Sequence, residues 1–255
     1  MVLTNLLPKK PIILPIRRFF GIFAENKHTM DSKTLINDAF NALISSIFAG
    51  ICISIGCIVN LMSGGGFAGA VLFTFGLIAV VHYRYKLYTG TAGFVNNIYE
   101  LTTLFIIILL GNVIGCKLMA ICSAYAIKDL NEYAYNISLT RMDVNWLQAL
   151  IRAMLCGFLM TTAVKFAREN KWLPLLFAVP VFILAGFYHS IADSFYLFCA
   201  DTYKDIDVGK CNYITIIIGN FIGCNIYRIT EKNNPKTAKN RRLDSTHHKT
   251  ISIEL

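Results

Sequence analysis

Long apolar stretches separated by short polar ones occupy most of this chain. The three longest cover residues 39–62, 98–125 and 146–166, and each reaches the roughly 20 residues that a helix needs to cross a hydrocarbon core of ~30 Å. Hydrophobic residues make up 55% of the 255 residues and charged residues only 15%, which is not the composition of a soluble domain. The length holds about six helical spans and no second domain. The chain is therefore predicted to be an all-α membrane protein.

Two further apolar stretches are each interrupted by polar residues. The stretch 67–81 runs into a polar segment over 82–90, and the stretch that begins near residue 173 is interrupted over 186–193. Each apolar part is too short to cross a bilayer as one unbroken helix. We expect broken helices at both places, as the second and fifth of the six spans.

A short motif occurs in both halves of the chain. The pattern Gly-Asn-x-Ile-Gly is found at 111–115 and at 219–223, in the third and sixth spans. An odd number of spans separates the two halves, so the second half enters the membrane from the opposite side and forms an inverted repeat. Backbone groups at helix breaks within a membrane are tolerated only where they are buried or line a cavity. The repeat therefore predicts a pore or binding site where the breaks meet.

The net charge of +9 indicates how the chain is oriented in the membrane rather than a nucleic-acid partner. If both termini are inside, sixteen Lys and Arg residues lie on the inner side, which satisfies the positive-inside rule for an even number of spans. The outer loops hold four: Lys128, Arg141, Lys204 and Lys210. The last four fall at or within apolar stretches, where an ionisable group is costly and marks function: Arg84, Lys86, Lys117 and Arg152.

The chain divides into three predicted parts. Residues 1–38 lack the apolar core and cleavage site of a signal peptide, and we expect a cytoplasmic segment with an amphipathic surface helix. Residues 39–228 form the six-helix transmembrane domain. Residues 229–255 are polar and basic, as expected of a disordered cytoplasmic tail.

Four motifs in order give the chain a family resemblance. They are Leu87-Tyr88-Thr89-Gly90, the segment from Gly186 to Asp193, and the two Gly-Asn-x-Ile-Gly repeats. Over residues 33–228 the sequence resembles the formate/nitrite transporter family. The resemblance implies an aquaporin-like fold of six helices, a homopentamer with one pore per protomer, and passage of formate, nitrite, hydrosulfide, lactate or similar weak-acid anions.

The chain departs from the family pattern at four charged or aromatic positions. Family members usually carry Glu where this chain has Lys86 and Tyr188, Asn where it has Asp193, and Phe where it has Tyr88. These changes bear on which anion is preferred.

One polar side chain at each break is a candidate for the chemistry of passage. His189 alone in an apolar stretch would ordinarily be a packing residue, but the resemblance places it at the centre of the pore. An imidazole, with an unperturbed pKa of ~6.5, can hold or lend a proton near neutral pH. Thr89 at the other break either donates a hydrogen bond to a dehydrated anion or caps a helix.

Dehydration is the physical obstacle that such a pore must overcome. A bare anion in the bilayer centre loses several kcal/mol or more of hydration, whereas its conjugate acid loses much less. Two mechanisms are open: protonation by His189 or by relayed water, and direct conduction of the anion past a neutral His189.

The resemblance assigns roles to the remaining candidates. Constriction positions are occupied by Phe73, Leu77, Leu87, Tyr88 and Phe182. Arg141 matches a lysine at the outer mouth, where a cation concentrates anions, although a solvated loop charge would look the same. Lys86 either does this on the inner side or extends toward lipid headgroups. Asn112 and Asn220 are expected to hold the broken segments through side-chain hydrogen bonds.

Two other functions remain as alternatives. A membrane enzyme could use His189 and Asp193, but no hydrolase or metalloprotease motif is present. An aquaporin-like channel for neutral solutes would need a duplicated Asn-Pro-Ala motif, which the sequence lacks. We expect no cofactor, no metal site and no enzymatic activity. The expected partners are a small anion, protons, membrane lipid and further copies of the chain.

Overall fold

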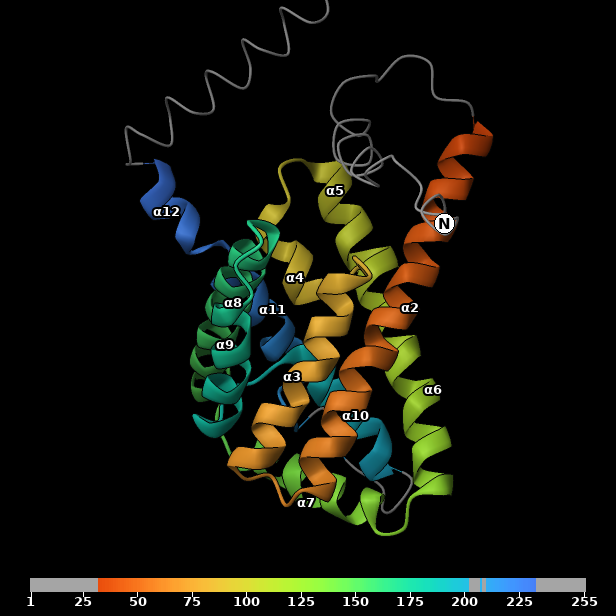
Figure 1. Cartoon of the computed structure of the whole chain (residues 1–255), viewed down its shortest axis with the longest axis vertical. Helices are drawn as coiled ribbons and strands as arrows, with labels where there is room; N and C mark the ends of the chain where they lie inside the picture. The colour runs from red at the N-terminus through yellow and green to blue at the C-terminus, as the bar shows by residue number, and fades with distance from the viewer. Residues whose placement is uncertain (1–31, 202–206, 208–209, 233–255) are drawn as a thin grey trace, which may run out of the picture. The chain divides into compact units, whose positions relative to one another are not determined.

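The computed structural model describes residues 32–201, 207 and 210–232, and these residues form helices and no strand. The chain divides into two units, residues 1–41 and 42–255, and the contacts discussed below lie within the second. In order, the elements are α2 (Ser32–Met62), α3 (Phe67–His82), α4 (Tyr88–Thr91), the 3-10 turn η1 (Ala92–Phe94), α5 (Ile98–Thr103), the π-helical η2 (Leu104–Leu109), α6 (Leu110–Ala126), α7 (Leu130–Met142), α8 (Trp146–Arg168), α9 (Leu173–Leu184), α10 (Ser190–Asp201), α11 (Tyr213–Asn225) and α12 (Tyr227–Lys232) (Figure 1).

Three helical stretches in the described residues are long and apolar enough to cross a membrane. They are Ile36–Met62, Glu100–Ala126 and Trp146–Arg168. Shorter apolar helices cover Phe67–His82, Leu173–Leu184 and Tyr213–Ile229. The all-α membrane fold predicted from the sequence is confirmed, while the count of six spans stays a prediction.

The predicted terminal segments fall largely outside the described residues. Of the predicted surface helix in 1–38, only residues 32–38 are described, and they begin α2. Of the predicted tail in 229–255, only 229–232 are described, and they end α12.

The two short apolar helices end in the same way. After α3, Arg84 adopts a φ of 59°, and after α9, Gly186 adopts a φ of 67°. In both cases the backbone N–H of the following residue donates to a carbonyl five residues earlier, from Tyr85 to Val80 and from Phe187 to Phe182, each at 2.9 Å. A left-handed residue with this hydrogen bond stops a helix. Each chain segment then continues as a second, separate helix, α4 after the first break and α10 after the second.

Glycines let the paired helices approach closely in both halves of the repeat. Between α2 and α6, a Cβ at Gly50 would collide with the backbone oxygen of Asn112. Between α8 and α11, a Cβ at Gly157 would collide with the backbone oxygen of Asn220, and one at Gly223 with that of Met154. Small residues at such crossings allow helices in lipid to pack backbone against backbone.

Replacing Gly223 with alanine will therefore lower the thermal stability of the protein. The new methyl group meets backbone atoms that cannot rotate away, at a cost of about 2–3 kcal/mol, which exceeds the ~1 kcal/mol that alanine gains over glycine in a helix. Thermal unfolding of the purified protein in detergent measures the effect. Gly66→Ala is the matched control, because a Cβ there meets nothing within 4 Å and its φ is −82°. Equal midpoints for the two variants would contradict the packing argument.

Candidate functional site

The first helix break is held by Asn112 of α6. Its buried Nδ2 donates to the backbone oxygens of Ser46 and Lys86, each at 2.8 Å, and its Oδ1 accepts the N–H of Tyr88 at 2.8 Å. One amide thus satisfies the Lys86 carbonyl and the Tyr88 N–H, which the break leaves without helical partners, and ties them to the backbone of α2 at Ser46. Lys86 takes part through its backbone, and its N–H also donates to the Ser45 hydroxyl at 3.1 Å.

The second break is held in the same way by Asn220 of α11. Its Nδ2 donates to the backbone oxygens of Ala153 and Tyr188, and its Oδ1 accepts the N–H of Ser190, all at 2.8 Å. The residue between the two bonded backbone groups is Leu87 in the first break and His189 in the second. The repeat seen in the sequence therefore extends to individual hydrogen bonds, and it places Leu87 and His189 at equivalent positions.

His189 and Thr89 meet across the two breaks. Thr89 Oγ1 lies 2.9 Å from His189 Nε2, and the two residues are 0% and 2% exposed. The other ring nitrogen, Nδ1, accepts the N–H of Ala192 at 3.2 Å, in the first turn of α10. This contact fixes the ring as a helix cap would, and it leaves Nε2 directed at the hydroxyl.

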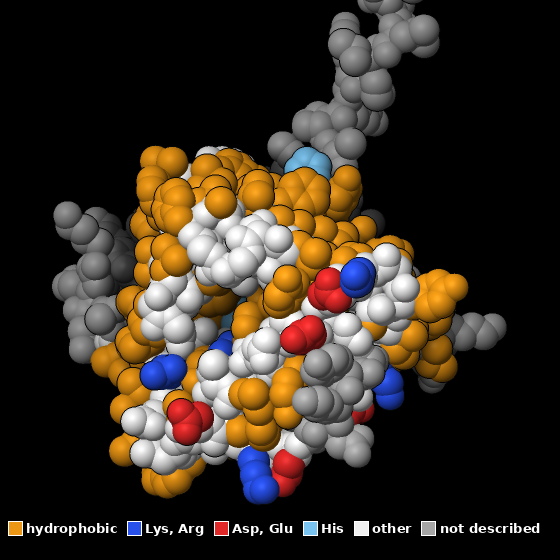
Figure 2. Space-filling view, turned by 90° about the horizontal axis from the view of Figure 1, so that it is seen from below, with side chains coloured by type: hydrophobic (Ala, Val, Ile, Leu, Met, Phe, Trp, Pro, Cys, Tyr) orange, Lys and Arg blue, Asp and Glu red, His pale blue; other side chains and the backbone are white. Residues whose placement is uncertain are grey.

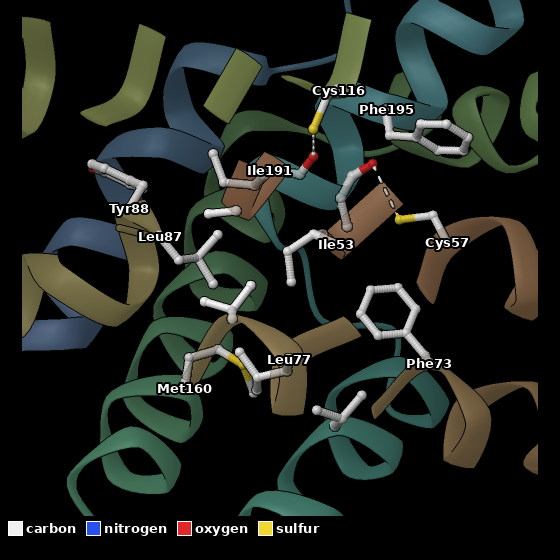
Figure 3. Packing of buried hydrophobic residues seen from close by; sticks show 14 of the residues in the cluster. Ile53, Cys57, Phe73, Leu77, Leu87, Tyr88, Cys116, Met160, Ile191 and Phe195 are labelled. Carbon is white, nitrogen blue, oxygen red and sulfur yellow. Dashed lines mark hydrogen bonds between the residues drawn. The ribbon is translucent and has the colours of Figure 1, made fainter. Parts of the chain in front are cut away.

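The predicted constriction residues belong to one cluster of buried hydrophobic side chains, part of which is drawn in Figure 3. The Phe182 ring lies 5.6 Å from the His189 ring, and the Phe73 ring packs edge-on against Phe182 at 5.7 Å. Leu77 and Leu87 are buried in the same cluster. The imidazole therefore sits in an apolar surrounding that contains few competing polar groups.

Tyr88 faces elsewhere than its neighbours in this cluster. Its hydroxyl donates to the backbone oxygen of Ile217 in α11 at 3.0 Å, and its ring lies 5.7 Å from that of Phe105. Figure 3 shows it apart from Leu77 and Phe73. These contacts anchor α4 to the helices around it.

A buried ion pair lies one helical turn beyond His189. Arg141 of α7 donates to Asp193 Oδ1 from Nε at 3.0 Å and from Nη2 at 2.8 Å, and the two side chains are 14% and 1% exposed. Sequence reasoning identified both residues but not their pairing. The i+4 spacing of His189 and Asp193 placed the carboxylate on the same helix, and only the packing of α7 on α10 supplies the partner.

Among the described residues, no group of three or more His, Cys, Asp or Glu is placed to hold a metal ion. What the site offers is one hydroxyl and one imidazole, buried together, with backbone groups satisfied by two asparagines. Such a pair can exchange hydrogen bonds with a small polar solute.

A family model described as formate/nitrite transporter matches residues 22–229. The chain belongs to the formate/nitrite transporter family. It is accordingly an integral membrane protein of a family that transports anions. None of the curated proteins matches it.

Two solved structures of membrane channels share the fold. A pentameric formate channel with formate bound is 20% identical, with a TM-score of 0.70 over 78% of this chain and 97% of that one. An ion channel of the FNT family is 18% identical, with a TM-score of 0.69 over 76% of this chain and 90% of that one. At these identities the likeness establishes the common fold, and the roles of individual side chains must be argued from their contacts.

Proposed function

We propose that this formate/nitrite transporter family member passes small monovalent weak-acid anions, with formate as the simplest example, together with protons. The observation that carries the proposal is the 2.9 Å contact between Thr89 Oγ1 and His189 Nε2, buried where two broken helices meet. An anion that leaves water there finds one hydrogen-bond donor, the Thr89 hydroxyl that His189 holds in place, and on either side it meets apolar side chains. The substrate of the pentameric formate channel fits this description.

The hydrogen bonds of the ring favour a neutral His189. Because a backbone N–H can only donate, Nδ1 accepts from Ala192, and the single proton of a neutral imidazole then lies on Nε2. Nε2 donates to Thr89 Oγ1, so the hydroxyl hydrogen is available to an anion; among the described residues Oγ1 has no second partner. In an imidazolium, Nδ1 would also carry a proton, and its N–H would point at the N–H of Ala192 with no acceptor between them.

Proton coupling in this arrangement uses water as the source. A proton that comes from the bulk solution and is passed along relayed water joins the anion while Thr89, oriented by His189, holds it, and the neutral acid crosses the apolar segment at a much lower dehydration cost. The proton leaves again to water beyond it. His189 keeps its own proton and acts by hydrogen bonding throughout.

The family and fold also support an assembly and an orientation. We propose a homopentamer with one pathway in each protomer, by analogy with the pentameric neighbour. We further propose that both termini are cytoplasmic, which follows from the distribution of Lys and Arg. In that orientation α7 lies at the outer end.

Formate uptake by liposomes that contain the full-length protein tests the proposal. An interior pH dye will report formate-dependent pH changes that protein-free liposomes lack. Thr89→Val, which keeps the side-chain shape but removes the hydroxyl, is expected to slow the change about tenfold, the effect of losing one hydrogen bond. Thr102→Val is the matched control, because that hydroxyl is exposed on α5. No formate-dependent signal from wild type would refute the proposed function.

A further inference from the structure

Two arginines flank the ring of Tyr188, the residue just before His189. The guanidinium carbon of Arg141 lies 4.4 Å from the ring centroid and that of Arg152 lies 5.3 Å from it. The ring itself is buried, with 1% of the residue exposed. Both cations are therefore fixed near the chain segment that leads into the central imidazole, toward the α7 end of the molecule.

The charge of Arg141 is already neutralised. Its Nε and Nη2 bond to Asp193, and its Nη1 donates to the Thr140 hydroxyl at 2.8 Å. Releasing this guanidinium to a passing anion would leave a buried carboxylate without its partner, which is strongly unfavourable. Arg141 is thus poorly suited to bind a second anion.

Arg152 of α8, unlike Arg141, bonds to a neutral group. Its Nη1 donates to the Tyr188 hydroxyl at 3.1 Å, and that hydroxyl donates in turn to the backbone oxygen of Thr140 at 3.2 Å. Among the described residues no carboxylate forms an ion pair with Arg152, and its side chain is only half-buried. A guanidinium carries five N–H donors in a planar fork that matches a carboxylate, and one of the five is engaged here.

The backbone beside Arg152 is that of the second helix break. Gly186 lies close to Nη1, where even an added Cβ would be at an ordinary contact distance of 3.9 Å. Figure 2 shows the α7 end of the molecule, where separate Lys or Arg and Asp or Glu side chains lie among uncharged and hydrophobic ones. The two arginines and one aspartate together carry a net charge of +1.

We infer that Arg152, held by Tyr188, is the residue that recruits and orients the anion before it reaches Thr89 and His189. Its ligand is a small monovalent carboxylate or a similar planar oxyanion, which it binds through two parallel N–H groups. Tyr188 is a positioning residue, and Arg141, held by Asp193, also packs on its ring. The inference rests on the proposed function and adds a recognition step to it.

Formate uptake over a range of concentrations tests this role in liposomes that contain the full-length protein. Arg152→Gln is expected to raise the half-saturating formate concentration about tenfold, the effect of one charge-assisted contact, while the maximal rate changes little. The variant should also lose much of the inhibition by added salt that the wild type shows. Lys128→Gln makes the same charge change at an exposed position next to α7 and should behave as wild type.

Two milder variants keep the test decisive if Arg152→Gln does not fold. Arg152→Lys retains the charge without the planar fork and should recover part of the affinity. Tyr188→Phe removes only the hydroxyl that holds Nη1 and should raise half-saturation about threefold. Values equal to those of Lys128→Gln in all variants that fold would overturn the inference while leaving the proposed function in place. Absence of uptake by wild type would overturn the proposed function and the inference with it.

Discussion

Replacing His189 with phenylalanine will reduce formate-dependent pH change in liposomes by about a hundredfold. The imidazole Nε2 bonds to Thr89 at 2.9 Å inside an apolar cluster, so its loss leaves the Thr89 hydroxyl without the partner that orients it at the place where the anion is least hydrated. A factor of a hundred corresponds to ~2.7 kcal/mol, within the cost of leaving buried polar groups unpaired. Phenylalanine keeps a planar aromatic ring at this position but has no nitrogen.

His82→Phe is the control for this experiment. His82 ends α3 and is exposed, so the same chemical change there leaves the buried hydroxyl and imidazole untouched. Formate uptake by His82→Phe should therefore exceed that by His189→Phe by the full factor of about a hundred. Equal uptake would show that the central imidazole plays no part in passage.

Alanine at either Asn112 or Asn220 will destabilise the protein severely and remove transport. Each asparagine makes three hydrogen bonds to backbone groups, two of them in one break and the third on the neighbouring helix α2 or α8, and each unsatisfied backbone group costs roughly 1–3 kcal/mol. Together they amount to a large part of a stability that is ordinarily about 5–15 kcal/mol. Because the two breaks have the same hydrogen bonds, the two variants should lose similar amounts of stability.

Thermal unfolding in detergent and liposome uptake measure the two consequences. Asn136→Ala is the control, since that side chain is exposed on α7. A variant of Asn112 or Asn220 that melts with the control would mean that the breaks are held by other contacts. A variant that melts with the control but transports poorly would mean that the amide acts on the solute directly.

The sequence determined the membrane class, the positions of the two breaks and the family. The apolar stretches needed no partner to be recognised, because hydropathy and helix length are properties of consecutive residues. The repeated glycine and asparagine motif likewise sits within single helices. His189 and Thr89 could be named for the same reason, since each lies inside a break.

Only the tertiary structure decided which groups meet. Asp193 pairs with Arg141, 52 positions away in the sequence, and Arg152 reaches Tyr188 across 36 positions. Both pairings depend on how α7 and α8 pack against the segment from Gly186 into α10. The ring nitrogen of His189 that remains for Thr89 is likewise set by the backbone of Ala192. Charge and hydropathy are properties of each residue alone. Which charges form pairs, and which nitrogen of an imidazole faces a hydroxyl, depend on distances between helices that no local pattern encodes.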